Sequence, residues 1–131
     1  MEKKSINPWN WQDNFGFSQA VEITGETKTL LCAGQTSISS EGQPLHKDDL
    51  HAQLNLSLEN IEAVLNKGGY DWTNIVRLIV YTTDVDQFFQ HYELLITKLQ
   101  KTEPKPVINI FGIKRLVFPE LMVEIEATAV K

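Results

Sequence analysis

Two carboxylates near the C-terminus, Glu124 and Glu126, have the spacing for acid–base chemistry on a strand. Residues 122–130 alternate strictly, so one strand face would carry apolar side chains and the other face polar ones. A carboxylate held on such a face can orient or deprotonate a water molecule. The same alternation is typical of an antiparallel strand with one solvated face, so a purely structural role for both residues stays open.

The other residue types that often carry chemistry give weaker patterns. The histidines His46, His51 and His91 lack the paired spacing of metal ligands, so we expect no metal site and surface positions for all three. Cys32 is the only cysteine, which excludes a disulfide within the chain. No histidine lies near Cys32 in sequence, so we expect an inert, buried thiol rather than a nucleophile.

Composition narrows the class of protein. We expect residues 1–131 to form a single domain, with 42% hydrophobic and 22% charged residues, a balance typical of a globular protein. The net charge of −5 and the lack of a basic, aromatic-rich face argue against a nucleic-acid partner. The N-terminus lacks the apolar core of a signal peptide, and no apolar run approaches membrane-spanning length. We therefore expect a cytoplasmic protein with no membrane partner.

The first part of the chain predicts an anchored segment followed by a hairpin. Residues 1–14 are polar and turn-rich, and Trp9 and Trp11 would hold them against the body of the protein. Residues 15–23 and 29–34 have strand-like patterns on either side of a tight turn at 24–26. This arrangement predicts that the two strands pair with each other.

Two helices and three strands are predicted after this point. Residues 47–67 predict a helix capped by Asp48 or Asp49 and ended by Gly68-Gly69. Its apolar stripe would comprise Leu50, Leu54, Leu58, Ile61 and Leu65. Residues 84–101 predict a second helix, whose buried side would comprise Val85, Phe88, Phe89, Tyr92, Leu95, Ile96 and Leu99. The predicted strands are residues 74–83, apolar on both faces and therefore central, and residues 107–113 and 122–130, with a turn at Phe118-Pro119 between them.

The predicted order, ββ-α-β-α-ββ, places two helices on one face of a mixed sheet. The other face of that sheet would then be uncovered. An uncovered sheet face with apolar side chains favours aggregation unless another surface covers it. We therefore expect the protein to bury this face by self-association.

Five stretches, in order, resemble motifs of the RidA family of reactive imine and enamine deaminases. They are GFSQAV at 16–21, LCAGQ at 31–35, LENIEAVL at 58–65 followed by Gly68-Gly69, VYTTDVDQF at 80–88 and MVEIEA at 122–127. The resemblance covers nearly the whole chain after residue 14. It implies an α+β, chorismate-mutase-like fold: a mixed sheet with two helices on one face, associating as a homotrimer. It also implies small-molecule binding in clefts between subunits. We expect no cofactor.

The resemblance implies positions for the site residues, and several of these depart from the family pattern. Deaminases of the family hold the substrate carboxylate with an arginine, and this position is occupied here by Ile108, or by Asn109 if the register shifts by one. A family tyrosine, serine and asparagine correspond to Phe17, Ala33 and Tyr92. The glutamate of the last strand is retained as Glu124, which we expect to be the catalytic residue if the protein is an enzyme.

These substitutions leave two functions open. The protein would bind a small metabolite between subunits and hydrolyse a reactive imine or enamine, with Glu124 acting on water, but not the usual amino-acid-derived substrates. Alternatively, it would be a non-catalytic, ligand-binding or regulatory trimer whose clefts are lined by Phe17, Ala33, Tyr92 and Ile108, with Trp9 or Trp11. An endoribonuclease activity is the weakest hypothesis, because the chain is acidic.

Overall fold

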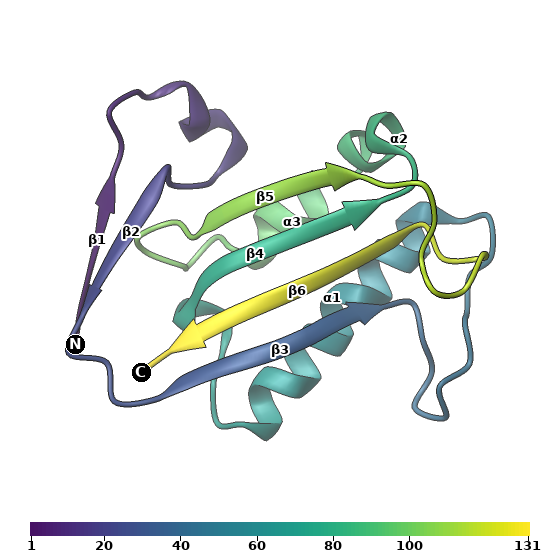
Figure 1. Ribbon diagram of the computed structural model, residues 1–131, viewed down its shortest axis with the longest axis horizontal. Coiled ribbons are helices and arrows are strands. Elements are labelled where there is room, and N and C mark those ends of the chain that lie inside the picture. Colours follow the sequence, from purple (N-terminus) through teal and green to yellow (C-terminus); the bar gives the residue numbers. More distant parts are fainter.

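The structure, a computed structural model, describes residues 1–131. A four-stranded sheet has helices packed on one face only (Figure 1). The elements are β1 (Glu2–Ile6), the 3₁₀ helix η1 (Trp11–Phe15), β2 (Ala20–Thr24), β3 (Thr29–Thr36), α1 (Leu50–Lys67), the 3₁₀ helix η2 (Trp72–Asn74), β4 (Ile75–Thr82), α2 (Val85–Gln90), α3 (Glu93–Lys98), β5 (Val107–Gly112) and β6 (Val123–Val130). None of the helices is both long and apolar enough to cross a membrane.

The sheet order is β3-β6-β4-β5, which confirms the predicted central position of the apolar strand 74–83. β4 runs parallel to β5 and antiparallel to β6, and β6 is antiparallel to β3. The mixed sheet with helices on one face agrees with the fold expected from the sequence. β4 separates β5 from β6 although these two strands follow each other along the chain.

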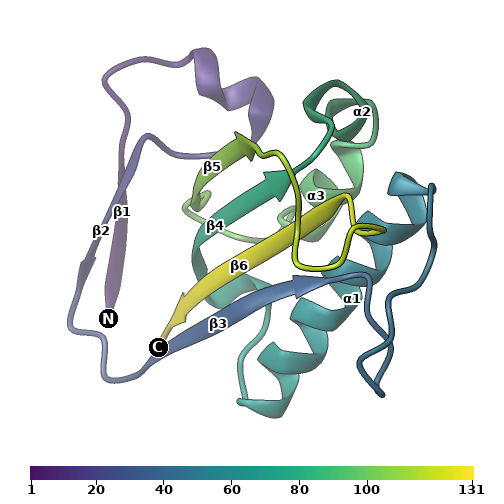
Figure 2. The same cartoon turned by 45° about the vertical axis from the view of Figure 1, so that its right-hand side comes forward.

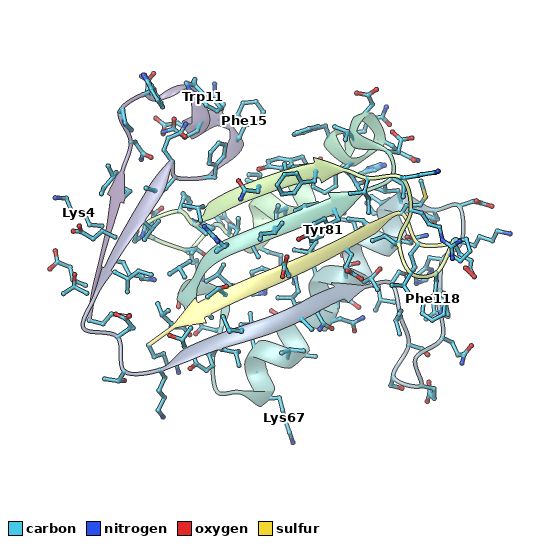
Figure 3. All side chains as sticks on the ribbon, viewed as in Figure 1. Lys4, Trp11, Phe15, Lys67, Tyr81 and Phe118 are labelled. Carbon is cyan, nitrogen blue, oxygen red and sulfur yellow. The ribbon has the colours of Figure 1, made fainter.

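The alternation in β6 has the predicted structural result. Its apolar side chains are at most 3% exposed and pack under the helices; they are Val123, Ile125, Ala127 and Ala129. Glu124, Glu126 and Thr128 are half-buried on the opposite face. This opposite face of the sheet, which carries Tyr81 in Figure 3, has no helix over it.

Helix α1 forms as its sequence predicts. The Asp49 side chain accepts a hydrogen bond from the Ala52 amide at 3.0 Å, so Asp49 rather than Asp48 is the cap. The predicted apolar stripe is at most 1% exposed and lies against the sheet. The helix ends before Gly68-Gly69, where Gly69 has the positive φ of 80° that a residue without a side chain adopts most easily.

The predicted hairpin between residues 15–23 and 29–34 is wrong. β2 pairs with β1, and β3 pairs with β6, so residues 25–28 connect two separate sheets. β3 finds an eight-residue antiparallel partner in β6, and backbone hydrogen bonds between Lys28 and Lys131 extend this pairing. Figure 2 shows the β1–β2 ribbon standing beside one end of the main sheet. The polar segment 1–14 therefore contains a strand that its side-chain pattern did not predict.

The predicted second helix is two short helices, α2 and α3, separated at His91 and Tyr92. The amides of both residues bond the carbonyl oxygen three positions back, which tightens the chain into a turn. The buried side chains still follow helical spacing across this break: Phe88, Tyr92, Leu95 and Leu99. Val85 and Phe89, which were predicted to be buried, are 37% and 41% exposed because α2 lies at the edge of the helical layer.

We expect Leu54→Ala or Ile61→Ala to lower the free energy of unfolding by roughly 2–5 kcal/mol, because each leaves a cavity between α1 and the sheet. Urea denaturation at one fixed protein concentration measures the loss. Glu59→Ala, on the exposed side of α1, is the control and should change stability by less than about 0.5 kcal/mol. Losses as small as the control at both positions would contradict the packing of this stripe.

Candidate functional site

A cavity of about 250 Å³ lies at the β5 edge of the sheet and is lined only by hydrophobic side chains. They are Trp11, Phe15, Phe17, Phe89, Tyr92, Ile108 and Ile110. The N-terminal turn, the α2–α3 junction and β5 each contribute some of them. Figure 3 shows Trp11 and Phe15 on the turn beyond β5. We call these seven residues the aromatic pocket.

Tyr92 joins the helical layer to the N-terminal turn. Its hydroxyl donates a hydrogen bond to the carbonyl oxygen of Phe15 at 2.7 Å, and its ring packs edge-to-face against the Phe15 ring. Burial raises the pKa of Tyr92 to about 12. Tyr92 is therefore a neutral, fixed wall of the aromatic pocket and not a general base near neutral pH.

The N-terminal turn is held in place by its own hydrogen bonds. The buried Gln12 side chain donates to the carbonyl oxygen of Trp9 at 3.0 Å and accepts from the Gln19 side chain at 3.2 Å. Gly16 ends η1 with φ of 71°, and a Cβ there would lie 2.6 Å from the Ile96 side chain. Only glycine combines this backbone angle with such close packing. These contacts fix the turn so that Trp11, which directly precedes Gln12, lines the aromatic pocket.

Ile108 faces the aromatic pocket from β5. It pairs in register with the buried Leu78 of β4, so both side chains lie on the helix side of the sheet. Asn109 pairs with Ile79 and lies on the opposite, open side. Because successive strand residues alternate between faces, only Ile108 of this pair can line the aromatic pocket.

Glu124 belongs to a second group of residues, on the open side of the sheet. It sits beside a β-bulge in β3, where the pairing with β6 shifts between Cys32 and Gln35. A Cβ on Gly34 would lie 2.5 Å from a Glu124 carboxylate oxygen, so the glycine gives this side chain its room. Desolvation, followed by repulsion from Glu126, raises the pKa of Glu124.

Glu126 and Tyr81 complete this second group. The Tyr81 hydroxyl donates a hydrogen bond to Glu126, and the Tyr81 ring stacks on Phe111 with centroids 6.0 Å apart. The hydrogen bond to Glu126 raises the pKa of Tyr81. Glu124 therefore has a carboxylate neighbour but no cation within the chain, an arrangement that favours a positively charged or proton-donating partner from outside.

The predicted site residues thus fall into two places. Phe17, Tyr92 and Ile108 meet in the aromatic pocket. Ala33 is exposed in the bulge of β3, beside Glu124, and Asn109 lies on the open face of β5. Sequence reasoning did not find Phe15 or Ile110, nor a lining role for Phe89. Ile110 could have been found, because the period of two in β5 places it on the same face as Ile108. The positions of Phe15 and Phe89 depend on tertiary packing, which the sequence pattern does not show.

The chain matches the family described as Endoribonuclease L-PSP over residues 12–131. It belongs to the RidA/YjgF family. A RutC family protein of Aquifex aeolicus is 32% identical over 115 residues, which cover 88% of each chain. A RutC family protein of Pyrococcus horikoshii is 30% identical over 115 residues, covering 88% of this chain and 86% of the relative.

Solved structures of the family have the same fold. The Rid protein YyfB of Yersinia pestis, described as a protein of unknown function, is 30% identical with a TM-score of 0.89, and all of both chains is covered. Escherichia coli TdcF with bound serine is 26% identical with a TM-score of 0.69, covering 88% of this chain and 87% of TdcF. The fold resemblance to YyfB includes the N-terminal ribbon and turn, since the whole chain is matched.

The remaining candidate residues have the surroundings expected of structural groups. Cys32 is 6% exposed within the core, and burial raises the pKa of its thiol, as expected for an inert cysteine. His46 and His51 are exposed, whereas His91 is half-buried with its ring 5.0 Å from that of His51. No group of three or more histidine, cysteine, aspartate or glutamate side chains is placed to hold a metal ion.

The raised pKa of Glu124 has a measurable effect on stability. The ionised form is disfavoured in the folded state, so its cost is present above the folded-state pKa and disappears as pH falls toward the unfolded-state pKa. Glu124→Gln should therefore melt at a higher temperature than the wild type at pH 8, with a difference that shrinks on acidification. Thermal melts from pH 8 to pH 4, with the exposed Glu41→Gln as control, measure this. A lower melting temperature for Glu124→Gln at pH 8 would contradict it.

Proposed function

We propose that this protein is a homotrimer that binds a small, mainly apolar or aromatic metabolite in clefts between its subunits. The observation that carries the proposal is the meeting of Phe17, Tyr92 and Ile108 in a pocket without any charged lining residue. A site built from ring faces and aliphatic side chains holds no cation for a carboxylate, so it favours a mainly apolar ligand without an acidic group.

The separation of the two groups of residues supports a site shared between copies. Glu124 lies on the open side of the sheet and the aromatic pocket lies beside the β5 edge, on the helix side. Because the two groups lie on opposite faces of one sheet, a shared site would combine the aromatic pocket of one copy with Glu124 of another. The open face also exposes Leu31 (77%) and Phe111 (49%), apolar surface that such contact would bury.

Hydrolysis of a reactive C=N bond is the second candidate, and Glu124 is the observation that favours it. A carboxylate with a raised pKa is better able to take a proton from water near neutral pH than an ordinary one. The substrate would be an imine or enamine without a carboxylate. The alternative is a non-catalytic trimer that holds or senses the same kind of molecule, with Glu124 orienting the ligand.

The TdcF structure with bound serine shows the contrast in ligand polarity. Serine carries a carboxylate, and an arginine binds a carboxylate through two charge-assisted hydrogen bonds. Ile108 and the rest of the aromatic pocket offer no such group. This supports a ligand that, unlike an amino acid, has no carboxylate.

We expect sedimentation velocity at micromolar concentration to give a homotrimer, because the open face is apolar in part and no helix of the chain covers it. Leu31→Glu, which places a charge on this face, should weaken the assembly, whereas Lys67→Glu at the end of α1 should leave it intact. A wild-type protein that sediments as a monomer would contradict the shared site.

We expect little or no acceleration of the hydrolysis of 2-iminopropionate or 2-aminoacrylate generated in the assay. Two charge-assisted hydrogen bonds to a carboxylate, each worth roughly 1.5–3 kcal/mol, are missing at Ile108, which lowers transition-state binding by about two to four powers of ten. Ammonia or 2-oxo-acid release, with and without the protein, measures the rate. A rate similar to that of an arginine-bearing family member would overturn the assignment.

The matched variants Ile108→Arg and Asn109→Arg test the position of the missing anchor. Ile108→Arg should raise the hydrolysis rate, because the new guanidinium would enter the aromatic pocket from β5. Asn109→Arg should not, because residue 109 lies on the other face of β5. No gain from Ile108→Arg would mean that the substitutions at Phe17 and Ala33 limit activity as much as the missing arginine does.

A further inference from the structure

We propose that the aromatic pocket is an aromatic cage that selects a compact alkylammonium cation over its uncharged counterpart. This inference rests on the binding role proposed above and specifies the charge of the ligand. It depends on the ring arrangement, on the charges around the pocket and on the lack of free hydrogen-bonding groups in its lining.

The five rings of the pocket are arranged as adjoining walls. Trp11 stands at 74° to Phe17 and 76° to Phe15, with ring centroids 5.7 and 6.4 Å apart. Phe15 stands at 73° to Phe89 and 79° to Tyr92, with centroids 6.4 and 6.5 Å apart. Near-perpendicular neighbours of this kind can each turn a face toward one shared pocket, which is open to solvent on one side. The face of an aromatic ring is its negative part, and several faces around one point attract a cation.

Three acidic residues lie close in sequence to lining residues of the pocket. Asp13 lies between Trp11 and Phe15 on the N-terminal turn, Asp86 precedes Phe89 by one helical turn, and Glu93 directly follows Tyr92. No lysine or arginine lines the pocket. The nearest basic residue before β5, Lys105, points its ammonium group at the carbonyl oxygens of Leu99, Gln100 and Thr102. The segments that supply the lining, residues 11–17, 86–93 and 108–110, carry three carboxylates and no lysine or arginine, a balance that favours a positive ligand over an anion.

The lining leaves the ring faces as the main means of recognition. The Tyr92 hydroxyl is already bonded to Phe15, and the Trp11 side chain is 56% exposed, so its indole N–H can stay in water. A ligand that needs several hydrogen bonds would lose them on entry and gain few in return. A quaternary ammonium group donates no hydrogen bonds, so it avoids this loss. The volume of about 250 Å³ suits a compact head group rather than a large molecule.

The experiment compares choline with 3,3-dimethyl-1-butanol, in which carbon replaces the charged nitrogen. Isothermal titration calorimetry of both against the wild-type protein, at equal ionic strength, isolates the effect of the charge. We expect choline to bind roughly two- to fivefold more tightly, the ratio that a partly exposed cation–π site provides. Trp11→Leu and Phe89→Leu keep the lining apolar and should reduce this ratio toward one. Trp9→Leu, two residues from Trp11 but outside the pocket, should leave it unchanged.

Each result separates the two proposals. A ratio near one with measurable binding of both compounds overturns the cation preference and leaves the apolar binding role standing. Binding of neither compound overturns the cation preference and also removes the support for a ligand-binding pocket. A preference for choline that persists undiminished in both Trp11→Leu and Phe89→Leu places the cation elsewhere and overturns the assignment to this cage. If Trp9→Leu also abolishes the preference for choline, the preference depends on the folding of the N-terminal turn as a whole. That result would overturn the proposed cage as well.

Discussion

The hydrogen bond from Tyr92 to the Phe15 carbonyl oxygen links two parts of the chain that are 77 residues apart. It occurs where the predicted second helix breaks into α2 and α3, and it holds the N-terminal turn over β5. Without this contact, the turn would be fixed to the body chiefly by the bond between the Ser18 amide and the Pro106 carbonyl and by ring packing. Tyr92 therefore lines the aromatic pocket and also anchors the turn that carries two other lining residues, Trp11 and Phe15.

The period of two along the strands divides the chemistry between the faces of the sheet. On β5, Ile108 and Ile110 line the aromatic pocket whereas Asn109 faces the open side. On β6, the apolar residues close the core, and Glu124 faces the open side beside the bulge at Gly34. One chain therefore presents an apolar half-site and an acidic half-site that cannot meet within it. Self-association through the open face would bury its uncovered apolar surface and could bring the two half-sites of different copies together.

Sequence reasoning predicted the elements whose side chains carry a strong period. The apolar stripe of α1 and the alternation of β6 were each sufficient to predict the element and its buried face, because a shift of either pattern would expose apolar residues. It failed where pairing depends on the backbone. β1 has the polar sequence Glu2–Ile6, which lacks a strand-like side-chain pattern, and the turn near Gly25 predicted local bending but not which strand would pair with β3. The same limit applies to the site. Ile108 could be placed from its motif, but Phe15 and Phe89 meet only through packing of distant elements.

The raised pKa of Glu124 connects the acidic half-site with the charge of the ligand. Glu124 is partly desolvated and lies next to Glu126. No neighbouring positive charge therefore compensates its own charge in the unliganded chain. A cation brought near it would lower its pKa again and recover that free energy on binding. An anion would raise its pKa further and be repelled. If a neighbouring copy places Glu124 at the mouth of the aromatic pocket, both halves of the site favour the same sign of charge. The ring faces and the carboxylate would then act together, and Ile108 leaves the cage free of a basic group that would repel the cation.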